Sequence, residues 1–518
     1  MVQLPTFEHT PMEGVETAYK TVYDKFHTHT TKPIEWRLKQ LRKLYWGMRD
    51  NMDLINAACL KDLGKPVHET YLSEVGWCMN DIIFVCKNLA KWVKDESAPD
   101  IDLLNKIVSP TIRKDPMGVV LIIGAYNFPF QLSIGPLIGA IAAGCTVVLK
   151  PSENAPAAGA VIEKIFKESL DPSAYQCVQG GVPETTSLLN NKWDLIFYTG
   201  NAAVGTIIAK KAAETLTPIV LELGGRNPAI ITKNANVRLA ARRLYWAKVH
   251  NAGQVCVSQN YILIDKEKLA EFLQELKNTI AEFYPDGVKN SKDYARIVNN
   301  RQWQRLKKML DESKGKILLG GTMDEADRFL EPTVVQVDDP TDSLLVDESF
   351  GPLIPIYPVN DLDEAIRLAN KVSDTSLGIY PFGNKKETAR VLNETRSGGA
   401  SINDGFFHAS IPTLAFGGVG QSGTGSYRGK ASFDAFTHRR SFTKTPGWME
   451  SLLAIRYPPY TGKTKQFRQM NEQKPTFDRD GNVYFTSRLK AWLFGTNTLV
   501  VVLLAVGIQQ YMQRRSKL

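Results

Sequence analysis

Short apolar runs alternate with helix-length segments through the middle of the chain, and this alternation limits the possible fold more than any other feature. The runs predict strands at residues 118–124, 146–150, 175–179, 194–200 and 218–225, and the intervening segments predict helices at 131–144, 156–170, 183–190 and 202–214. Strands that alternate with helices of about 10–15 residues indicate βαβ units. We therefore expect an α/β fold with a parallel sheet covered by helices on both faces.

The flanking segments complete the predicted organisation. Residues 14–95 have apolar positions at helical spacing, and residues 101–114 are rich in Ile and Val, which indicates extended chain. A second alternation runs from about 236 to 402, whereas residues 446–488 are expected to be irregular. The 518 residues have room for roughly two to four domains.

The distribution of charge excludes a nucleic-acid partner. The formal net charge is +9, but the residues from Ile455 onward account for eight of these nine charges, so the rest of the chain is nearly neutral. The excess flanks an apolar stretch, where basic residues would meet anionic lipid headgroups.

The cysteines and histidines indicate a reduced protein without a metal. The six cysteines are Cys59, Cys78, Cys86, Cys145, Cys177 and Cys256, and they form no C-x-x-C pair. Residues 1–30 contain no apolar secretory signal, so we expect free thiols in a reducing compartment. The histidines do not cluster with cysteines at metal-ligand spacing, and we expect no metal site.

The C-terminal tail carries two targeting features. Residues 491–513 contain no charge and are long enough to cross about 30 Å of hydrocarbon, with Trp492 and Tyr511 placed as interfacial aromatic residues. The strongly apolar core is only 499–508, so an amphipathic or buried helix is the alternative. The terminal Ser-Lys-Leu at 516–518 matches a peroxisomal targeting signal, which an import receptor reads. The tail predicts a membrane-associated peroxisomal protein, with the endoplasmic reticulum membrane as the alternative.

Two residues are candidates for covalent and general-base catalysis. Cys256 follows a Gly-containing turn and precedes an apolar strand, so it could be a nucleophile, although an isolated cysteine is more often a buried apolar residue. Glu222 ends an apolar strand before two glycines. Desolvation there would raise its pKa and suit a general base, and a solvated strand-end Glu is the alternative.

Three further segments are candidates for binding. Asn127 follows the strand at 118–124, where its amide could donate to an oxyanion, and an ordinary turn Asn is the alternative. Glycines at the start of the helix after 194–200 would let backbone N–H groups bind a pyrophosphate, or they form a plain strand–helix turn. Glu348 and Phe350 place an acid and an aromatic ring in a loop, which by default lies at the surface.

Together, these motifs resemble those of the aldehyde dehydrogenase superfamily. Its signatures are N-x-G-Q-x-C at 251–256, L-E-L-G-G at 221–225 and E-S-F-G-P at 348–352. The Lys-Pro-Ser-Glu segment at 150–153 and the residues around 403–420 resemble the class 3 branch, in particular its membrane-bound fatty aldehyde dehydrogenases of fungal type.

The resemblance implies a domain organisation. It assigns residues 1–222 to a Rossmann-like NAD-binding domain with oligomerisation strands near 98–116, 223–426 to an α/β catalytic domain, 427–445 to a strand that joins the partner subunit of a homodimer, 446–490 to a C-terminal extension, 491–513 to a membrane helix and 516–518 to the targeting signal.

The resemblance also implies site residues. It makes Cys256 the nucleophile, Asn127 the oxyanion donor and Glu222 the base that activates water. It places the cofactor at Lys150, Glu153, Gly200, Asn201, Ala202, Ala203, Val204, Gly205, Glu348 and Phe350. Because Glu153 would repel a 2′-phosphate, the expected cofactor is NAD rather than NADP.

The implied reaction is oxidation of long-chain fatty aldehydes to fatty acids, since a membrane position suits a substrate dissolved in lipid. One alternative is a soluble-type dehydrogenase of short or medium aldehydes that the tail only localises. Another is a membrane scaffold without catalytic activity.

Overall fold

The computed structural model describes residues 2–101, 105–473 and 475–484. They fall into two compact units, one within Met1–Pro99 and Thr111–Phe442, the other within Asp100–Pro110 and Thr443–Leu518. The larger unit contains all four sheets of the described residues, including the small pair of β11 (Met323–Asp324) and β12 (Phe329–Leu330), and the candidate site lies entirely within it.

The first sheet contains the predicted βαβ units. Its strand order is β17 (Gly423–Thr424), β7 (Ile219–Leu223), β6 (Leu195–Gly200), β3 (Val119–Ile123), β4 (Thr146–Lys150) and β5 (Tyr175–Cys177). All neighbours are parallel except β17, which is antiparallel to β7. The helices that connect the parallel strands are α6 (Gln131–Ala143), α7 (Pro156–Ser169), α8 (Val182–Leu189) and α9 (Ala202–Ala213). The predicted α/β class, the five predicted strands and the four predicted helices are confirmed, whereas β17 was not predicted.

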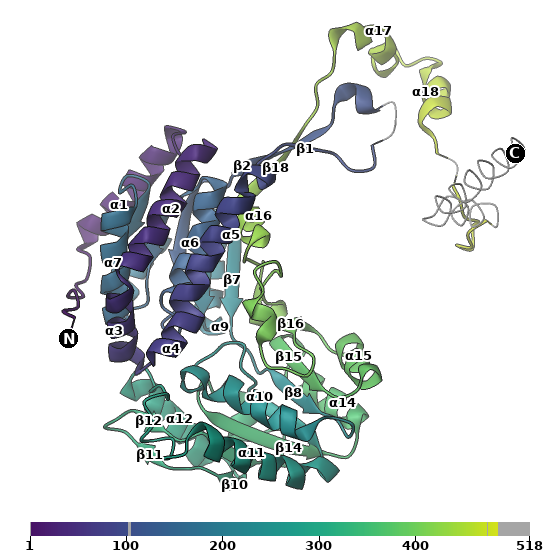
Figure 1. The fold of residues 1–518 in the computed structure, drawn as a ribbon. Helices are drawn as coiled ribbons and strands as arrows, with labels where there is room; N and C mark the ends of the chain where they lie inside the picture. Colours follow the sequence, from purple (N-terminus) through teal and green to yellow (C-terminus); the bar gives the residue numbers. More distant parts are fainter. Residues whose placement is uncertain (1, 102–104, 474, 485–518) are drawn as a thin grey trace, which may run out of the picture. The chain divides into compact units, whose positions relative to one another are not determined.

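Strand β3 is buried on both faces, as its continuous apolar sequence predicts. Its alternate residues enter different cores: Val120 and Ile122 pack with α6 and α7, whereas Leu121 packs with α1 and α9. Five N-terminal helical segments cover the sheet region, as expected for residues 14–95 (Figure 1). They are α1 (Met12–His27), α2 (Ile34–Asp50), α3 (Met52–Leu63), the short α4 (Val67–Thr70) with its π-helical continuation η1 (Tyr71–Val75), and α5 (Gly76–Trp92).

The second sheet accounts for the alternation expected between residues 236 and 402. Its strand order is β10 (Lys316–Leu319), β13 (Thr333–Gln336), β14 (Leu353–Val359), β9 (Tyr261–Asp265), β8 (Pro228–Ile231), β15 (Ser376–Phe382) and β16 (Ser397–Ala400). Only the β10–β13 pair is antiparallel. Its main helices are α10 (Val237–Val249), α11 (Leu269–Phe283), α12 (Asn300–Glu312), α14 (Leu362–Val372) and α15 (Lys385–Glu394). The predicted domain boundary at 222/223 falls inside β7, just before this sheet begins.

A third, antiparallel sheet joins β1 (Glu96–Ser97), β2 (Thr111–Pro116) and β18 (Thr437–Phe442). These strands lie in the segments predicted for oligomerisation, near 98–116 and within 427–445. Strand β18 pairs with β2 of its own chain and is an edge strand among the described residues. Its addition to a partner subunit stays a prediction.

Two segments of the smaller unit differ from what the sequence predicts. Residues Asn105–Val108 form a 3-10 turn, η2, rather than extended chain, because local backbone bonding such as Ser109 N–H to Lys106 O closes it at 3.0 Å. Residues 446–488 are not uniformly irregular, since they include the short helices η7 (Gly447–Met449), α17 (Glu450–Leu453), η8 (Ala454–Arg456) and α18 (Lys463–Asn471).

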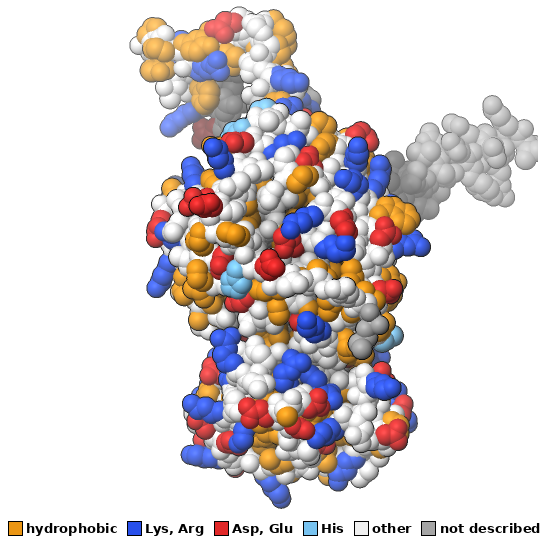
Figure 2. Space-filling view, turned by 90° about the vertical axis from the view of Figure 1, so that its left-hand side faces the viewer, with side chains coloured by type: hydrophobic (Ala, Val, Ile, Leu, Met, Phe, Trp, Pro, Cys, Tyr) orange, Lys and Arg blue, Asp and Glu red, His pale blue; other side chains and the backbone are white. Residues whose placement is uncertain are grey.

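Two expectations concern the charge of the body of the protein and the membrane anchor in its C-terminal tail. On the face of the larger unit drawn in Figure 2, blue and red side chains are interspersed, in keeping with a nearly neutral body. Among the described residues, no helix is both long and apolar enough to cross a bilayer. The predicted anchor at 491–513 and the signal at 516–518 lie outside the described residues, so both stay predictions.

Candidate active site

A cavity of about 760 Å³ lies at the carboxyl ends of β3, β4, β6 and β7, where open parallel sheets bind ligands. Its lining includes eleven of the thirteen candidate residues: Asn127, Lys150, Glu153, Gly200, Asn201, Ala202, Val204, Glu222, Cys256, Glu348 and Phe350. Ala203 is exposed and Gly205 is buried, and neither lines the cavity. Gly205 has a packing role instead, because a Cβ there would lie 2.9 Å from a Leu223 methyl group.

The turn before Cys256 has an unusual backbone. Asn251, Ala252 and Gly253 have φ values of 52°, 51° and 74°, so three consecutive residues occupy the left-handed region. Non-glycine residues adopt this conformation uncommonly, and surrounding contacts must stabilise it. The Asn251 side chain donates to the carbonyl oxygens of Asn127 and Gln254 at 2.9 and 3.0 Å. At Gly253 a Cβ would lie 2.3 Å from the Gly351 carbonyl oxygen, so a glycine is required.

Asn227, which the sequence analysis missed, holds the backbone on the other side of Cys256. Its amide nitrogen donates to the carbonyl oxygens of Cys256 and Ser258 at 2.7 and 2.9 Å, and its amide oxygen accepts from Gly378 N–H at 2.8 Å. The only signal in the sequence was a polar residue directly before the apolar run of β8.

The Cys256 thiol is neutral in this environment. Burial raises its pKa to about 12, and the neighbouring acids Glu348 and Glu222 act in the same direction. The backbone N–H groups of Val257 and Cys256 oppose these effects, because donors directed at sulfur favour the thiolate. A cationic partner or a proton acceptor is therefore needed to generate the nucleophilic form.

Glu222 is a buried, unpaired carboxyl group, as its position at a strand end before two glycines predicted. Its residue is 3% exposed, and neither carboxyl oxygen has a hydrogen-bond partner among the described residues. Burial raises its pKa well above the ordinary range. A carboxyl group in this setting has the proton affinity that a general base requires near neutral pH.

Glu348 is a further acidic group that raises the pKa of Cys256, and its loop is not a free surface loop. Burial raises its pKa to about 7, while the Gly225 N–H and the cations Lys248 and Arg305 oppose the rise. Lys248, which the sequence analysis missed, is buried in α10, and burial lowers its pKa to about 7. The loop is fixed from α12, where Arg305 donates to the Glu348 carbonyl oxygen at 3.2 Å.

Asn127 connects the loop after β3 to the turn before Cys256. Its side-chain nitrogen donates one hydrogen bond to the Gln254 carbonyl oxygen at 3.1 Å, so its second N–H remains available on a residue that lines the cavity. Its backbone carbonyl accepts from Lys65 Nζ at 3.0 Å as well as from Asn251. Residues 127, 222 and 256 thus lie at one cavity.

The other end of the cavity is suited to a nucleotide. The Asn201 side chain caps α9 by accepting from Val204 N–H at 2.9 Å, which leaves the first N–H groups of the helix for a ligand. A Cβ at Gly200 would lie 2.1 Å from the Tyr198 hydroxyl, so a larger residue at the end of β6 would require the Tyr198 side chain to shift. Lys150 Nζ lies 3.0 Å from Glu153 Oε2 and donates to the Gly180 carbonyl oxygen at 2.8 Å.

An apolar cluster surrounds Cys256 away from these polar groups. Its buried members are Phe128, Leu132, Val255, Val257 and Leu377, and Ala125, Phe406 and Phe416 pack against it. The Phe406 ring lies 5.4 Å from the ring of Trp246, whose residue is 39% exposed. Aromatic and aliphatic side chains therefore extend from the thiol towards the surface. Among the described residues, no group of His, Cys, Asp and Glu could hold a metal ion.

Comparison with known proteins agrees with this arrangement. Residues 3–442 match the aldehyde dehydrogenase family. The chain is 49% identical over 494 residues to beta-apo-4'-carotenal oxygenase of Neurospora crassa, covering 95% of this chain and 93% of that protein. It is 40% identical to human aldehyde dehydrogenase family 3 member B1 (86% and 95% covered) and 39% identical to the mouse aldehyde dehydrogenase described as dimeric and NADP-preferring (87% and 99% covered).

A solved structure extends the agreement to the fold. The substrate-bound state of Staphylococcus aureus AldH matches with a TM-score of 0.85 and 38% sequence identity, covering 88% of this chain and 99% of that chain. The chain belongs to the aldehyde dehydrogenase family. Within it, the family 3 relatives place it in the class 3 branch.

The acidic cluster predicts a pH-dependent effect of Glu348 on the thiol. Because the Glu348 anion raises the pKa of Cys256, Glu348→Gln should speed alkylation of Cys256 by iodoacetamide. The pKa of Glu348 is about 7, so the carboxyl group is neutral at low pH. The ratio of variant to wild-type rates should be near one at about pH 5.5 and rise as the pH passes through 7.

Alkylation of the Cys256 peptide would be followed by mass spectrometry in the absence of cofactor. Asp347→Asn is the matched control, because it removes a neighbouring, exposed carboxylate that also lines the cavity. A ratio that stays constant from pH 5.5 to 8.5 contradicts the assigned interaction.

Proposed function

We propose that this protein oxidises long-chain fatty aldehydes to fatty acids with NAD as the hydride acceptor. The observation that carries the proposal is the meeting of Cys256, Glu222 and Asn127 at one cavity, which also includes the start of α9, while an apolar cluster packs against Cys256.

The first half of the reaction uses Cys256 and two donors. The Cys256 thiol loses its proton to solvent, the thiolate attacks the aldehyde carbon and forms a C–S bond, and the electron pair of the broken C=O π bond moves to oxygen, which becomes an oxyanion. The free N–H of the Asn127 side chain and the Cys256 backbone N–H are the donors for this oxyanion. When bound, NAD supplies a hydride acceptor and a positive charge that favours the Cys256 thiolate.

The second half uses Glu222. After hydride loss, the substrate is a thioester on Cys256. The Glu222 carboxylate takes a proton from water, the hydroxide attacks the thioester carbon, and the C–S bond breaks to release the acid and regenerate the cysteine. The burial that raises the pKa of Glu222 keeps its proton affinity high enough for this role.

Substitution of the two residues separates the half-reactions. Cys256→Ser should abolish aldehyde-dependent NADH formation. Glu222→Gln should give a pre-steady-state burst of NADH followed by slow turnover, because acylation survives while hydrolysis of the thioester does not. Stopped-flow absorbance at 340 nm measures both. Full activity of the serine variant contradicts the mechanism and would leave the scaffold alternative, and loss of the burst in Glu222→Gln places Glu222 in acylation instead.

The proposed preference for NAD rests on Glu153. Burial acts to raise its pKa, but Lys150 and local hydrogen bonds outweigh burial, and the pKa is lowered, so the group is an anion at neutral pH. An anion at the adenosine end would repel a 2′-phosphate. The mouse relative described as NADP-preferring supports the opposite cofactor preference for this chain. Substitution of Glu153 distinguishes the two.

Glu153→Gln should raise the ratio of kcat/KM for NADP to that for NAD by about tenfold, because it removes a like-charge contact. Glu163→Gln, which removes a carboxylate on α7 that pairs with Lys167 and does not line the cavity, should leave the ratio unchanged. An unchanged ratio in Glu153→Gln assigns cofactor choice to other residues.

The substrate class rests on the apolar cluster and on the apolar tail. A long alkyl chain would be buried against the aromatic and aliphatic side chains beside Cys256. The Neurospora relative is described as a beta-apo-4'-carotenal oxygenase, so an apocarotenal, which is also a long apolar aldehyde, is a second candidate substrate. A short or medium aldehyde is the third.

Steady-state kinetics with hexadecanal, an apocarotenal and propanal distinguishes the three. We expect kcat/KM to be at least about tenfold higher for hexadecanal than for propanal, since each buried methylene contributes about 0.8 kcal/mol. Phe406→Ala should reduce the hexadecanal value more than the propanal value, whereas Phe407→Ala, an exposed neighbour, should not. Equal values for both aldehydes contradict the proposed substrate.

The location and partners complete the proposal. The signal at 516–518 would bring the enzyme to the peroxisome through the import receptor, and residues 491–513 would hold it at the lipid in which the substrate is dissolved, with the endoplasmic reticulum membrane as the alternative. A homodimer is supported by the position of β18 at one edge of the third sheet among the described residues, where a strand of a second copy could add, and by the mouse relative described as dimeric.

A further inference from the structure

A buried ion pair lies behind the residues that meet the substrate. Lys65 Nζ lies 2.7 Å from Glu74 Oε1, and both side chains have no exposed surface. Neither residue lines the cavity or belongs to a motif discussed above. Charges this deep carry a large desolvation cost, and an apolar pair of the same size often gives equal or greater stability. The pair therefore calls for an explanation other than packing.

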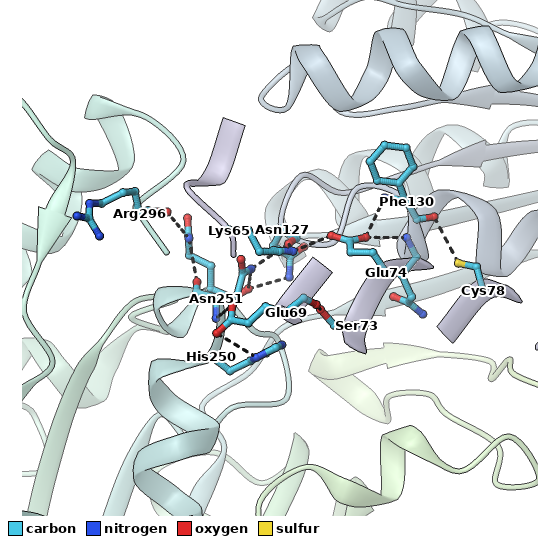
Figure 3. A network of polar contacts seen from close by, with 12 residues as sticks. Lys65, Glu69, Ser73, Glu74, Cys78, Asn127, Phe130, His250, Asn251 and Arg296 are labelled. Atoms are coloured by element: carbon cyan, nitrogen blue, oxygen red, sulfur yellow. Dashed lines mark hydrogen bonds and ion pairs between the residues drawn. The ribbon is translucent and has the colours of Figure 1, made fainter. Parts of the chain in front are cut away.

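Lys65 and Glu74 both form hydrogen bonds with the backbone of residues 127–131. Lys65 Nζ donates to the Asn127 carbonyl oxygen at 3.0 Å and lies 4.4 Å from the centre of the Phe128 ring. Glu74 Oε2 accepts from the N–H groups of Phe130 and Gln131, both at 3.0 Å, at the start of α6. Figure 3 shows the chain of contacts from Lys65 through Glu74 to this segment.

The Asn127 carbonyl links the ion pair to the Cys256 turn. It accepts from Lys65 Nζ and from Asn251 Nδ2, so both of its lone pairs are used. Two donors from different directions fix the peptide plane that follows Asn127. The side chain of Asn127 leaves the same Cα atom, and its orientation towards Cys256 depends on that plane.

The π-helical turn η1 places a second acid, Glu69, where it can contact the turn before Cys256 while Glu74 contacts the start of α6. Glu69 Oε2 accepts from Asn251 N–H at 2.9 Å, while Glu74, five residues later, contacts the α6 start. In a regular α-helix, residues five apart point about 140° apart around the axis. The wider π turn, closed by bonds between residues five apart, brings such side chains closer to one face. Figure 3 shows Glu69 beside Asn251 and His250, and Glu74 beside Lys65 and the backbone at Phe130.

We propose that Lys65, held in place by Glu74, is a positioning residue that fixes the Asn127 peptide so that the Asn127 side chain can donate to the substrate oxyanion. This inference rests on the proposed oxyanion role of Asn127. Lys65 acts through Asn127 and does not touch the substrate.

The test compares Lys65→Met, Asn127→Ala and the double variant by the burst rate of NADH formation at saturating cofactor. Lys65→Met should lower the burst rate by about 10²-fold, as expected for a misplaced catalytic group, while the dissociation constant for NAD changes less than about twofold. Because both substitutions remove the same donor, the double variant should be no slower than Asn127→Ala alone.

Two further variants separate positioning from stability. Lys65→Met/Glu74→Gln removes both charges and leaves an amide oxygen for the α6 backbone, so it should fold and still show the slow burst. Lys114→Met is the matched control. Lys114 is also a buried lysine that bridges a carboxylate, Glu96, and a backbone carbonyl, that of Lys94, and it lies in the third sheet. It should leave the burst rate unchanged.

The proposal is overturned if Lys65→Met or Lys65→Met/Glu74→Gln folds and keeps a burst rate within about threefold of the wild type. It is likewise overturned if the rate losses of Lys65→Met and Asn127→Ala multiply when the two substitutions are combined. It is also overturned if Asn127→Ala leaves the burst intact. Full activity of Cys256→Ser contradicts the proposed reaction itself, so the two failures are distinguishable.

Discussion

The left-handed turn at residues 251–253 is the constraint on which the site depends. Three consecutive residues in this region are unfavourable for an L-amino-acid chain, so the conformation exists only because other elements stabilise it. The stabilising groups come from α4 (Glu69), from the loop after β3 (the Asn127 carbonyl) and from the turn's own Gln254. The N-terminal helices and both large sheets must therefore be assembled before Cys256 reaches its position.

The electrostatics of the cavity follow from the same assembly. Cys256, Glu222 and Glu348 line the same cavity, and burial shifts the pKa of each upward. Three neighbouring acids of this kind favour their neutral forms, and Lys248, whose pKa burial lowers to about 7, adds little fixed charge. The result is a site whose total charge changes readily when one positive group enters it, which suits a reaction driven by an oxidised, cationic cofactor.

The sequence predicted the parts of this protein that depend on local patterns. The strand at 146–150 has the predicted bounds. The helix predicted at 131–144 ends at Gly144, whose φ of 92° is a left-handed conformation that glycine adopts without strain. The desolvated Glu222 followed from its place between an apolar strand and two glycines. The motif resemblance identified most of the residues that line the end of the cavity at the start of α9, although it also included Ala203 and Gly205, which do not line the cavity.

The residues that sequence reasoning missed all act at long range. Asn227, Lys65 and Lys248 have ordinary neighbours in the sequence, and each gains its role from a partner that the fold brings near: Cys256, Asn127 and Glu348. Periodicity and spacing carry no information about such contacts. The 3-10 turn at 105–108 was missed for a different reason, because Ile and Val enrichment indicated strand where local backbone bonding determines a turn.

Strand β17 gives this architecture a consequence for biosynthesis. Gly423 pairs with Glu222, and Thr424 pairs with Leu221, so the edge of β7 at Glu222 is completed by residues about 200 positions later in the chain. A nascent polypeptide emerging from the ribosome lacks this partner and leaves the edge of β7 unpaired, a surface that invites association with other strands. Completion of the sheet edge beside Glu222 is consequently tied to release of nearly the whole polypeptide.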